Sequence, residues 1–389
     1  MTRETNRVTI GYMDSHEPSG ADSHKDRPVG ERIDEISRCL SNLISRAINI
    51  ERQAGKQEEW YYRLHGQLKV VEDSVRALNE WRGRMEVQQY DLSPFIRFGT
   101  STWAYEGWQG MVYHQSYEKR RFKQECLAEY ARYAHRGHPL FRTVGLDLSF
   151  YGPPTVELLA NYAKQLPGGF EMCSKVWEEI TIPRFADHPR YGAKAGKPNP
   201  RFLDAKVFIE EVLPPYEQAL KGRIGPFIFE FQRTGLLPST FLPRLDTFLS
   251  QLPRCYRYAI EVRNPLILTQ QYKDILAAHE ASHVYNHWTA MPPLAHQHRK
   301  LSNSFTAQFV LLRLLTPLGM RYEAAVKRAE PYNRIIQELP DMRSDTIALV
   351  KHAVAEQRTA YVLVNNRSEG SAPLTVQALV DELRGIQES

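Results

Sequence analysis

The feature that most constrains the fold is a regular alternation that begins at Ile96 and continues to the C-terminus. Short segments rich in β-branched and aromatic residues are followed by longer segments whose apolar residues have helical spacing. Eight segments of the first kind are predicted to be strands: Ile96–Thr102, Thr143–Ser149, Phe170–Lys175, Pro226–Phe231, Tyr258–Val262, His283–His287, Phe309–Leu314 and Tyr361–Asn365.

The segments between these strands are predicted to be mostly helical, and the sixth connection, Thr289–Ser304, is expected to be irregular. The predicted helices are Phe122–Ala134, Val156–Gln165, Ala205–Ala219, Pro243–Gln251, Gln271–Ala278, Arg343–Ala355 and Val376–Ile386. Eight strands with helical connections predict an α/β fold, a closed parallel (β/α)8 barrel of TIM type. An open doubly wound sheet is the alternative, but no glycine-rich phosphate-binding turn follows any of the strands.

The chain has 389 residues, whereas such a barrel needs about 250, so an N-terminal extension is expected. Residues 1–30 have no hydrophobic period and are predicted to be a disordered tail. Residues 31–92 carry apolar residues at heptad spacing and are predicted to be a helical, coiled-coil-like extension. This region could form a long helix that makes a homo-oligomer, a hairpin that turns near Ala54-Gly55, or a helix packed on the barrel of residues 93–389.

Composition narrows the class of protein. Hydrophobic residues make up 42% and charged residues 24%, which is typical of a globular chain, and the net charge of +5 is only mildly basic. We expect no membrane span, because no run of about 18 apolar residues occurs. The four cysteines form no C-x-x-C pair, and no signal-peptide pattern opens the chain, so a cytoplasmic protein with reduced thiols is expected.

Polar residues come late in otherwise apolar strands. Glu230 follows three apolar residues, as does Glu261, and Arg263 lies two residues further on, so it projects to the same side as Glu261. In this fold, functional residues lie at the carboxyl ends of the strands. Other residues noted at predicted strand ends are the aromatic Trp103 and the polar residues Asp147, Lys175, Asn286, His287, Arg313, Asn365 and Asn366.

If these side chains point inward, six charged groups meet at one mouth of the barrel. They are the acids Asp147, Glu230 and Glu261 and the bases Lys175, Arg263 and Arg313. We interpret this group as a ligand or catalytic pocket. The alternative is an ion-pair network that closes the top of the barrel and binds nothing.

Two further features have weaker functional interpretations. The segment Pro183–Lys206 carries six basic residues with Tyr191 and Phe202 between them, which suits phosphate or nucleic-acid binding, although a solvated insertion is the simpler explanation. The pair His296 and His298 lacks the spacing of a metal site, so no metal ligands are assigned, and no cofactor is evident.

Four motifs resemble one known family. Phe98-Gly-Thr-Ser-Thr-Trp103, with Tyr105 and Trp108-Gln-Gly110 after it, resembles the opening signature of the YecE-like family, domain of unknown function 72. The other three motifs are Phe141-Arg-Thr-Val144 through Ser149-Phe-Tyr151, Tyr258-Ala-Ile-Glu-Val-Arg263, and Asn365-Asn366 with Gly370-Ser-Ala-Pro373. The resemblance covers residues 96–386 and implies a TIM-type barrel, distantly similar to sugar isomerases and apurinic endonucleases, without an established reaction.

This chain departs from the family pattern, which marks a divergent branch. Gly145 and Asp147 stand where the family has Glu and Asn, Glu230 replaces a Gln, and Leu315-Thr316 replaces a His-Gly pair after Arg313.

From the strand ends and the resemblance together, two sets of site residues are predicted. The predicted catalytic residues are Glu261, Lys175 and Asp147. The predicted substrate-binding residues are Trp103, Glu230, Arg263, Arg313 and Asn366.

Three functional hypotheses remain open. The first is an enzyme, a hydrolase, lyase or isomerase, with Glu261 as general acid or base and the cations holding a small anionic or sugar-phosphate-like substrate. The second is nucleic-acid binding or processing through the basic loop. The third is a non-catalytic module that binds a partner protein.

Overall fold

A computed structural model describes residues 92–385. The predicted tail, residues 1–30, and all but the last residue of the predicted heptad region, residues 31–92, lie outside the described residues. No helix within the described range is long and apolar enough to cross a membrane.

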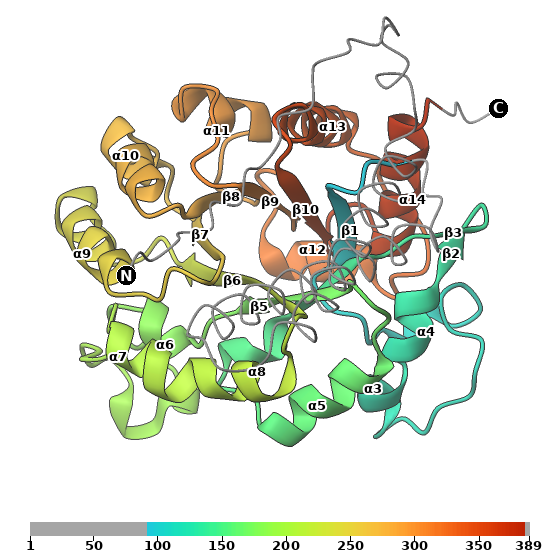
Figure 1. Ribbon diagram of the computed structural model, residues 1–389, viewed down its shortest axis with the longest axis horizontal. Helices are drawn as coiled ribbons and strands as arrows, with labels where there is room; N and C mark the ends of the chain where they lie inside the picture. The colour runs from blue at the N-terminus through green and yellow to red at the C-terminus, as the bar shows by residue number, and fades with distance from the viewer. Residues whose placement is uncertain (1–91, 386–389) are drawn as a thin grey trace, which may run out of the picture. The chain divides into compact units, whose positions relative to one another are not determined.

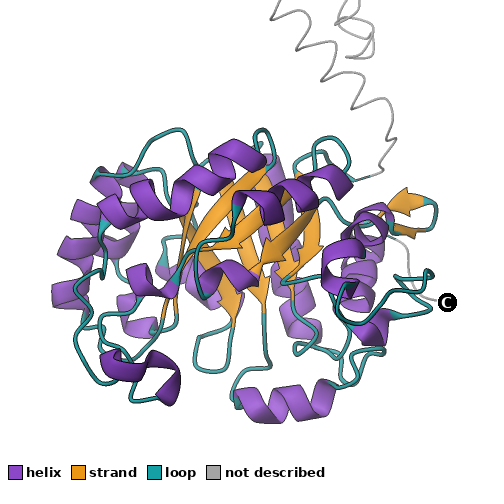
Figure 2. Ribbon diagram, turned by 90° about the horizontal axis from the view of Figure 1, so that it is seen from below, coloured by secondary structure: helices purple, strands orange, loops and turns teal. Residues whose placement is uncertain are grey.

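Eight parallel strands form one sheet, which curls into a nearly closed barrel with the helices outside it (Figures 1 and 2). The hydrogen-bonded order is β1-β10-β9-β8-β7-β6-β5-β4. The strands are β1 (Ile96–Thr100), β4 (Thr143–Leu146), β5 (Glu171–Lys175), β6 (Ile224–Phe231), β7 (Tyr258–Val262), β8 (Ser282–His287), β9 (Phe309–Leu314) and β10 (Thr359–Val364). All eight predicted strands are present, so the predicted TIM-type barrel is confirmed.

The seam of the barrel lies between β1 and β4, the two ends of the hydrogen-bonded order. The backbone N–H of Arg142 donates to the carbonyl of Phe98 across it, at 2.9 Å. Gly99 permits this approach, because a Cβ atom at that position would lie 2.1 Å from the carbonyl oxygen of Thr143. The buried hydroxyl of Tyr130 accepts from the backbone N–H of Thr100 at 2.9 Å and lies 3.4 Å from the carbonyl oxygen of Thr143.

The interior of the barrel has an apolar middle. Because side chains in a strand alternate between faces, every second residue of a barrel strand points inward. The buried cluster within the barrel comprises Cys173, Ile228, Ala259, Val284, Ala307, Phe309, Leu311, Tyr361 and Leu363. Two residues further along β5, β6, β7 and β9 stand Lys175, Glu230, Glu261 and Arg313, so polar groups lie above the apolar middle at the carboxyl ends of the strands.

The helices pack around the strands in Figure 1 and share with them a larger buried apolar cluster. They are α3 (Phe122–Glu125), α4 (Leu127–Arg132), α5 (Val156–Gln165), α6 (Glu178–Thr181), α7 (Ala205–Val207), α8 (Leu213–Ala219), α9 (Pro238–Ser250), α10 (Gln270–Ala278), α11 (Leu294–Lys300), α12 (Tyr322–Ala329), α13 (Pro340–Ala355) and α14 (Ala372–Leu383). Helix α5 has the predicted bounds, because Thr155 caps it by accepting from the N–H of Leu158.

Two predictions about these connections were wrong, and one helix was not predicted. The stretch Thr289–Ser304 is not irregular, because α11 begins directly after the proline pair Pro292-Pro293, where fixed backbone angles favour a helix start. The predicted helix Phe122–Ala134 is interrupted at Cys126, and Ala134 lies instead in a small hairpin, β2 (Ala134–His135) with β3 (His138–Pro139). The segment of α12 was not predicted to be helical.

Candidate functional site

The six charged residues predicted at the mouth converge at the carboxyl ends of five different strands. Lys175 ends β5, Glu230 and Glu261 face each other on β6 and β7, and Arg313 lies on β9. The other two lie just beyond a strand: Arg263 follows β7, and Asp147 opens a short 3-10 turn after β4.

Glu230 and Glu261 are joined to the cations by short contacts. One carboxylate oxygen of Glu230, Oε2, lies 2.8 Å from Lys175 Nζ, 2.8 Å from Arg263 Nη2 and 3.2 Å from Arg313 Nη1. The two oxygens of Glu261 accept from different guanidinium groups, Oε1 from Arg263 at 3.0 Å and Oε2 from Arg313 at 2.5 Å. Arg313 reaches Asp147 as well, at 3.2 Å.

The electrostatics of this cluster keep Glu230 ionised. Burial alone would raise the pKa of its carboxyl group, but the positive charges of Arg263, Lys175 and Arg313 outweigh burial and hold this pKa far below the ordinary value. The charged form of Arg313 is favoured in the same way. Burial would lower the pKa of its guanidinium, yet Glu261, Asp147 and Glu230 raise it above the ordinary value.

The cluster is layered by exposure. The side chain of Glu261 is 0% exposed and that of Glu230 3%, whereas Arg263 is 10% exposed, Lys175 12% and Asp147 35%. Solvent therefore meets two cations and one carboxylate, and the two glutamates lie beneath them.

Aromatic rings flank the two accessible cations. The ammonium of Lys175 lies 3.9 Å from the ring centroid of Phe150, and the guanidinium carbon of Arg263 lies 4.0 Å from that of Trp288. Both rings are partly exposed. They fix the cations in place by cation–π attraction and offer apolar surface beside them.

Two of the predicted substrate-binding residues do not join the cluster. Trp103 is fully buried, its indole N–H donates to the carbonyl of Lys123 at 3.0 Å, and its ring packs edge-on against Tyr162. Asn366 is buried too: its side-chain oxygen accepts from the backbone N–H of Ala372 at 2.8 Å and from the indole of Trp108 at 3.3 Å. Both residues hold loops together in this structure, and their predicted contact with a substrate remains a prediction.

Several residues near the mouth were not among the predicted site residues, although Tyr105 and Phe150 belong to the family motifs. The tyrosine Tyr105 has its pKa raised by burial, while Arg367 lowers it and Asp147 raises it, which relates Tyr105 electrostatically to the mouth. Phe150, Trp288 and Arg367 come from loops or strand ends, where an aromatic or basic residue has no periodic neighbour to mark it. Phe150 and Trp288 are identified by their contacts with Lys175 and Arg263, and Arg367 by its electrostatic effect on Tyr105.

The basic loop, Pro183–Lys206, is largely neutralised by acidic residues. Arg190 pairs with Glu178 at 2.7 Å, Lys194 pairs with Glu179, and Arg201 lies 3.3 Å from Glu179 and also pairs with Glu211. Most of the positive charge of this loop is therefore paired with carboxylates and is less available to the phosphates of a nucleic acid.

Two buried histidines, one on β8 and one on α11, contact residues of the surrounding helices and strands and do not join the cluster. His283 contacts Tyr272 and Gln297, and His298 contacts Tyr285 and His352. In the described part of the chain, no group of three or more histidines, cysteines or acidic residues could hold a metal ion.

Comparison with known proteins agrees with the fold and the motifs. The model of a family described as "Protein of unknown function DUF72" matches residues 97–389. The chain belongs to the DUF72 family. No curated protein is significantly similar to it in sequence.

Solved structures of other DUF72 proteins share the barrel. A DUF72 family protein from Enterococcus faecalis V583 is 15% identical, with a TM-score of 0.53, and the match covers 76% of this chain and 97% of that one. A DUF72 family protein from Thermotoga maritima MSB8 is 17% identical, with a TM-score of 0.50 over 74% of this chain and 99% of that one. At these identities the similarity establishes the fold alone.

One departure of this DUF72 chain has a structural explanation. At Gly145, a Cβ atom would lie 2.5 Å from the carbonyl oxygen of Ser101, so no larger side chain fits unless the loop after β1 moves. The close approach of β4 to that loop therefore requires a glycine at position 145.

Proposed function

We propose that this DUF72 protein binds a small anionic molecule at the carboxyl mouth of its barrel, through Lys175 and Arg263. The layering of the cluster supports this most directly. The glutamates are 0–3% exposed, while the side chains of Lys175 and Arg263, beside Phe150 and Trp288, keep 12% and 10% of their surface exposed. Lys175 and Arg263 are the most exposed cations of the cluster and are the groups that a carboxylate or phosphate would bind, although Asp147 is more exposed than either.

The main argument against this proposal is that the cluster is neutral, with three acids and three bases that satisfy one another. A purely structural network does not need cations in its more solvent-exposed layer, however, because even partial exposure weakens their attraction to the glutamates through screening by water. The rings of Phe150 and Trp288 are also partly exposed, and such a network does not need apolar surface beside the two cations.

The roles that we assign differ among the charged residues. Arg313 is a positioning residue, because it is buried and bonded to Glu230, Glu261 and Asp147. Glu261 is poorly placed for proton transfer, since arginines occupy both its oxygens. If the protein is an enzyme, Asp147 is the better candidate for a general acid or base, because it is the most exposed carboxylate of the cluster.

Calorimetric titration of the full-length protein tests this proposal. The panel would hold sugar phosphates, nucleotides and small carboxylates, each with an uncharged analogue. We expect an anion to bind and its analogue not to, and the affinity to fall at least tenfold in Lys175→Met. The matched control is Lys206→Met, an exposed lysine 3.8 Å from Glu210, which should bind as the unmodified protein does.

Two outcomes would contradict the proposal. One is that no anion in the panel binds to the folded protein. The other is that an anion binds equally well to Lys175→Met and to the unmodified protein, with a second variant, Arg263→Gln, equally without effect. Either outcome would favour the ion-pair network that only closes the barrel.

A further inference from the structure

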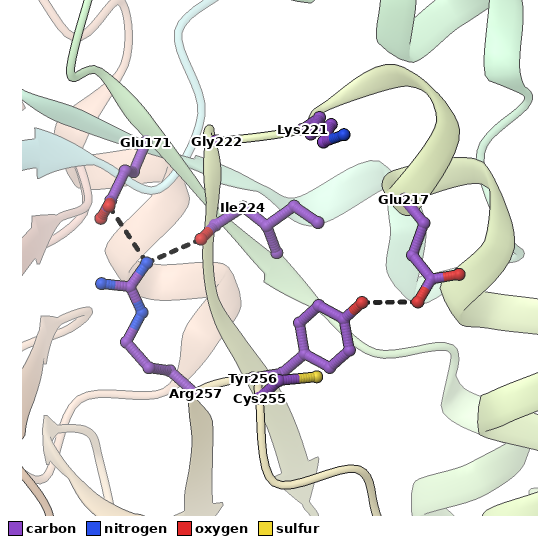
Figure 3. Close-up of a pocket in the computed structure, with 8 residues that line it drawn as sticks. All are labelled: Glu171, Glu217, Lys221, Gly222, Ile224, Cys255, Tyr256 and Arg257. Atoms are coloured by element: carbon purple, nitrogen blue, oxygen red, sulfur yellow. Dashed lines mark hydrogen bonds and ion pairs between the residues drawn. The ribbon is translucent and has the colours of Figure 1, made fainter. Parts of the chain in front are cut away.

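A pocket with a volume of about 630 Å³ lies at the amino-terminal end of the barrel strands, opposite the charged cluster. Figure 3 shows it between the start of β6, the loop that follows α8 and the loop that precedes β7. Its volume is within the range of about 300–1,000 Å³ that is usual for small-molecule sites. The lining residues that matter here are Glu171, Glu217, Lys221, Ile224, Tyr256 and Arg257.

One side of this pocket is a fixed polar network. Arg257 donates to Glu171 at 3.1 Å, to the carbonyl of Ile224 at 2.7 Å and to the hydroxyl of Tyr361 at 2.7 Å. A second guanidinium, that of Arg97, lies 3.7 Å from Glu171. Two guanidinium groups therefore share one carboxylate, which leaves this side with excess positive charge.

The other side presents a carboxylate without a cation. Glu217 accepts a hydrogen bond at 2.5 Å from the hydroxyl of Tyr256, and it makes no ion pair with any residue between 92 and 385. In Figure 3 this pair faces the Glu171–Arg257 pair across the pocket. Lys221 follows Glu217 by four residues and is exposed at the rim, and within the same range it has no ion pair.

We propose that this pocket binds a small zwitterion, a molecule of dipeptide size with both a carboxylate and an ammonium group. The carboxylate would lie toward Lys221 and the positively charged side with Arg257. The ammonium group would bind Glu217, and the body of the ligand would pack on Ile224 and the ring of Tyr256. This proposal is independent of the anion site, because the two sites lie at opposite ends of the strands.

A purely structural role explains only part of the pocket. Residues at the amino-terminal face of such a barrel usually contribute to stability, and the network of Arg257, Glu171 and Tyr361 fits that role. Glu217 and Lys221 lie outside this network: both are exposed, and neither forms an ion pair in the described part of the chain, so both are open to a ligand.

The test uses alanyl-alanine and two derivatives, titrated into the full-length protein. N-acetylation removes the ammonium group, and C-terminal amidation removes the carboxylate. We expect alanyl-alanine to bind on the order of tenfold more tightly than either derivative, because each lost charge removes one charge-assisted hydrogen bond. Glu217→Gln should abolish the difference between the dipeptide and its acetylated form, and Lys221→Met the difference between the dipeptide and its amide.

The matched controls are Glu210→Gln and Lys206→Met, exposed residues on the neighbouring helical segment outside the lining of the pocket. Both should bind alanyl-alanine as the unmodified protein does. The proposal is overturned if alanyl-alanine does not bind at millimolar concentration. Equal binding of all three compounds, or equal binding by Glu217→Gln and its control, would overturn it as well.

Discussion

At the scale of single residues, Glu261 is expected to matter for stability whatever binds at the mouth. Its carboxylate is completely buried between Arg263 and Arg313, so Glu261→Gln leaves two guanidinium groups short of a counter-charge. Breaking a buried ion pair from one side costs about 3–5 kcal/mol. We expect the free energy of unfolding, from urea denaturation, to fall by about 3 kcal/mol.

Glu210→Gln is the matched control for this prediction, because Glu210 forms an exposed pair with Lys206 at 3.8 Å. Such pairs contribute about 0–1 kcal/mol, so this variant should be nearly as stable as the unmodified protein. Similar stability for Glu261→Gln and Glu210→Gln would mean that the cluster is not held as a buried ionic network.

The sequence could identify the charged residues of the mouth but not everything around them. Lys175, Glu230, Glu261 and Arg313 interrupt apolar strands, and strand alternation then fixes the side on which they lie. Trp103 follows a strand in the same way, yet it packs under the loops, because a residue beyond the last strand hydrogen bond no longer obeys the alternation.

At the scale of elements, buried histidines lie where the outward face of strand β8 packs against the helices. His283 lies under α10 and α11, and burial lowers its pKa to about 4; His298 on α11 has its pKa lowered to about 4 by burial and by the nearby His352. Such a histidine takes up a proton more readily in the unfolded chain. Stability is therefore fully present above about pH 6.5 and should decrease as the pH falls from there toward 4.

His283→Gln tests this expectation. Between pH 6.5 and 5, the free energy of unfolding should depend less steeply on pH in the variant, by about 1 kcal/mol per pH unit. Glu230 does not affect this slope, because its pKa is lowered in the folded protein and its contribution to the free energy of unfolding declines only below about pH 4.5. In the control, His296→Gln, the exposed imidazole is removed, and the slope should stay unchanged. An unchanged slope in His283→Gln would show that His283 is not held neutral.

Elements with strong periodic signals were predictable, and short polar ones were not. The strands could be predicted from the sequence because each is an apolar run between segments with helical spacing. The inward face of helix α11 includes the polar residues Gln297 and His298, which are buried, so the sequence of this helix shows no clear apolar period. Those side chains are buried because they bond to β8, a partner that is distant in sequence and visible only in the fold.

At the scale of the whole molecule, the barrel has an apolar middle with a polar end on each side. The mouth cluster and the Arg257 network are separated by the cluster of Cys173, Ile228, Leu311 and their neighbours. Changes at one end are therefore expected to leave binding at the other unaffected, since mutations without shared partners usually act independently.

Closure of the barrel depends on the approach of β1 to β4 at Gly99. In Gly99→Ala, the new methyl group would meet the carbonyl oxygen of Thr143 at 2.1 Å, so the seam must open or the strands must shift. Because the nearest obstacle is the backbone carbonyl group of Thr143, which cannot rotate away, we expect a loss of about 3 kcal/mol or more, at the upper end of what overpacking costs. Gly152→Ala is the control, since a Cβ atom there meets nothing within 4 Å, and it should change stability by less than about 1 kcal/mol. Equal urea midpoints for the two variants would mean that the strands at the seam are further apart than described, and the barrel would then be an open sheet at this point.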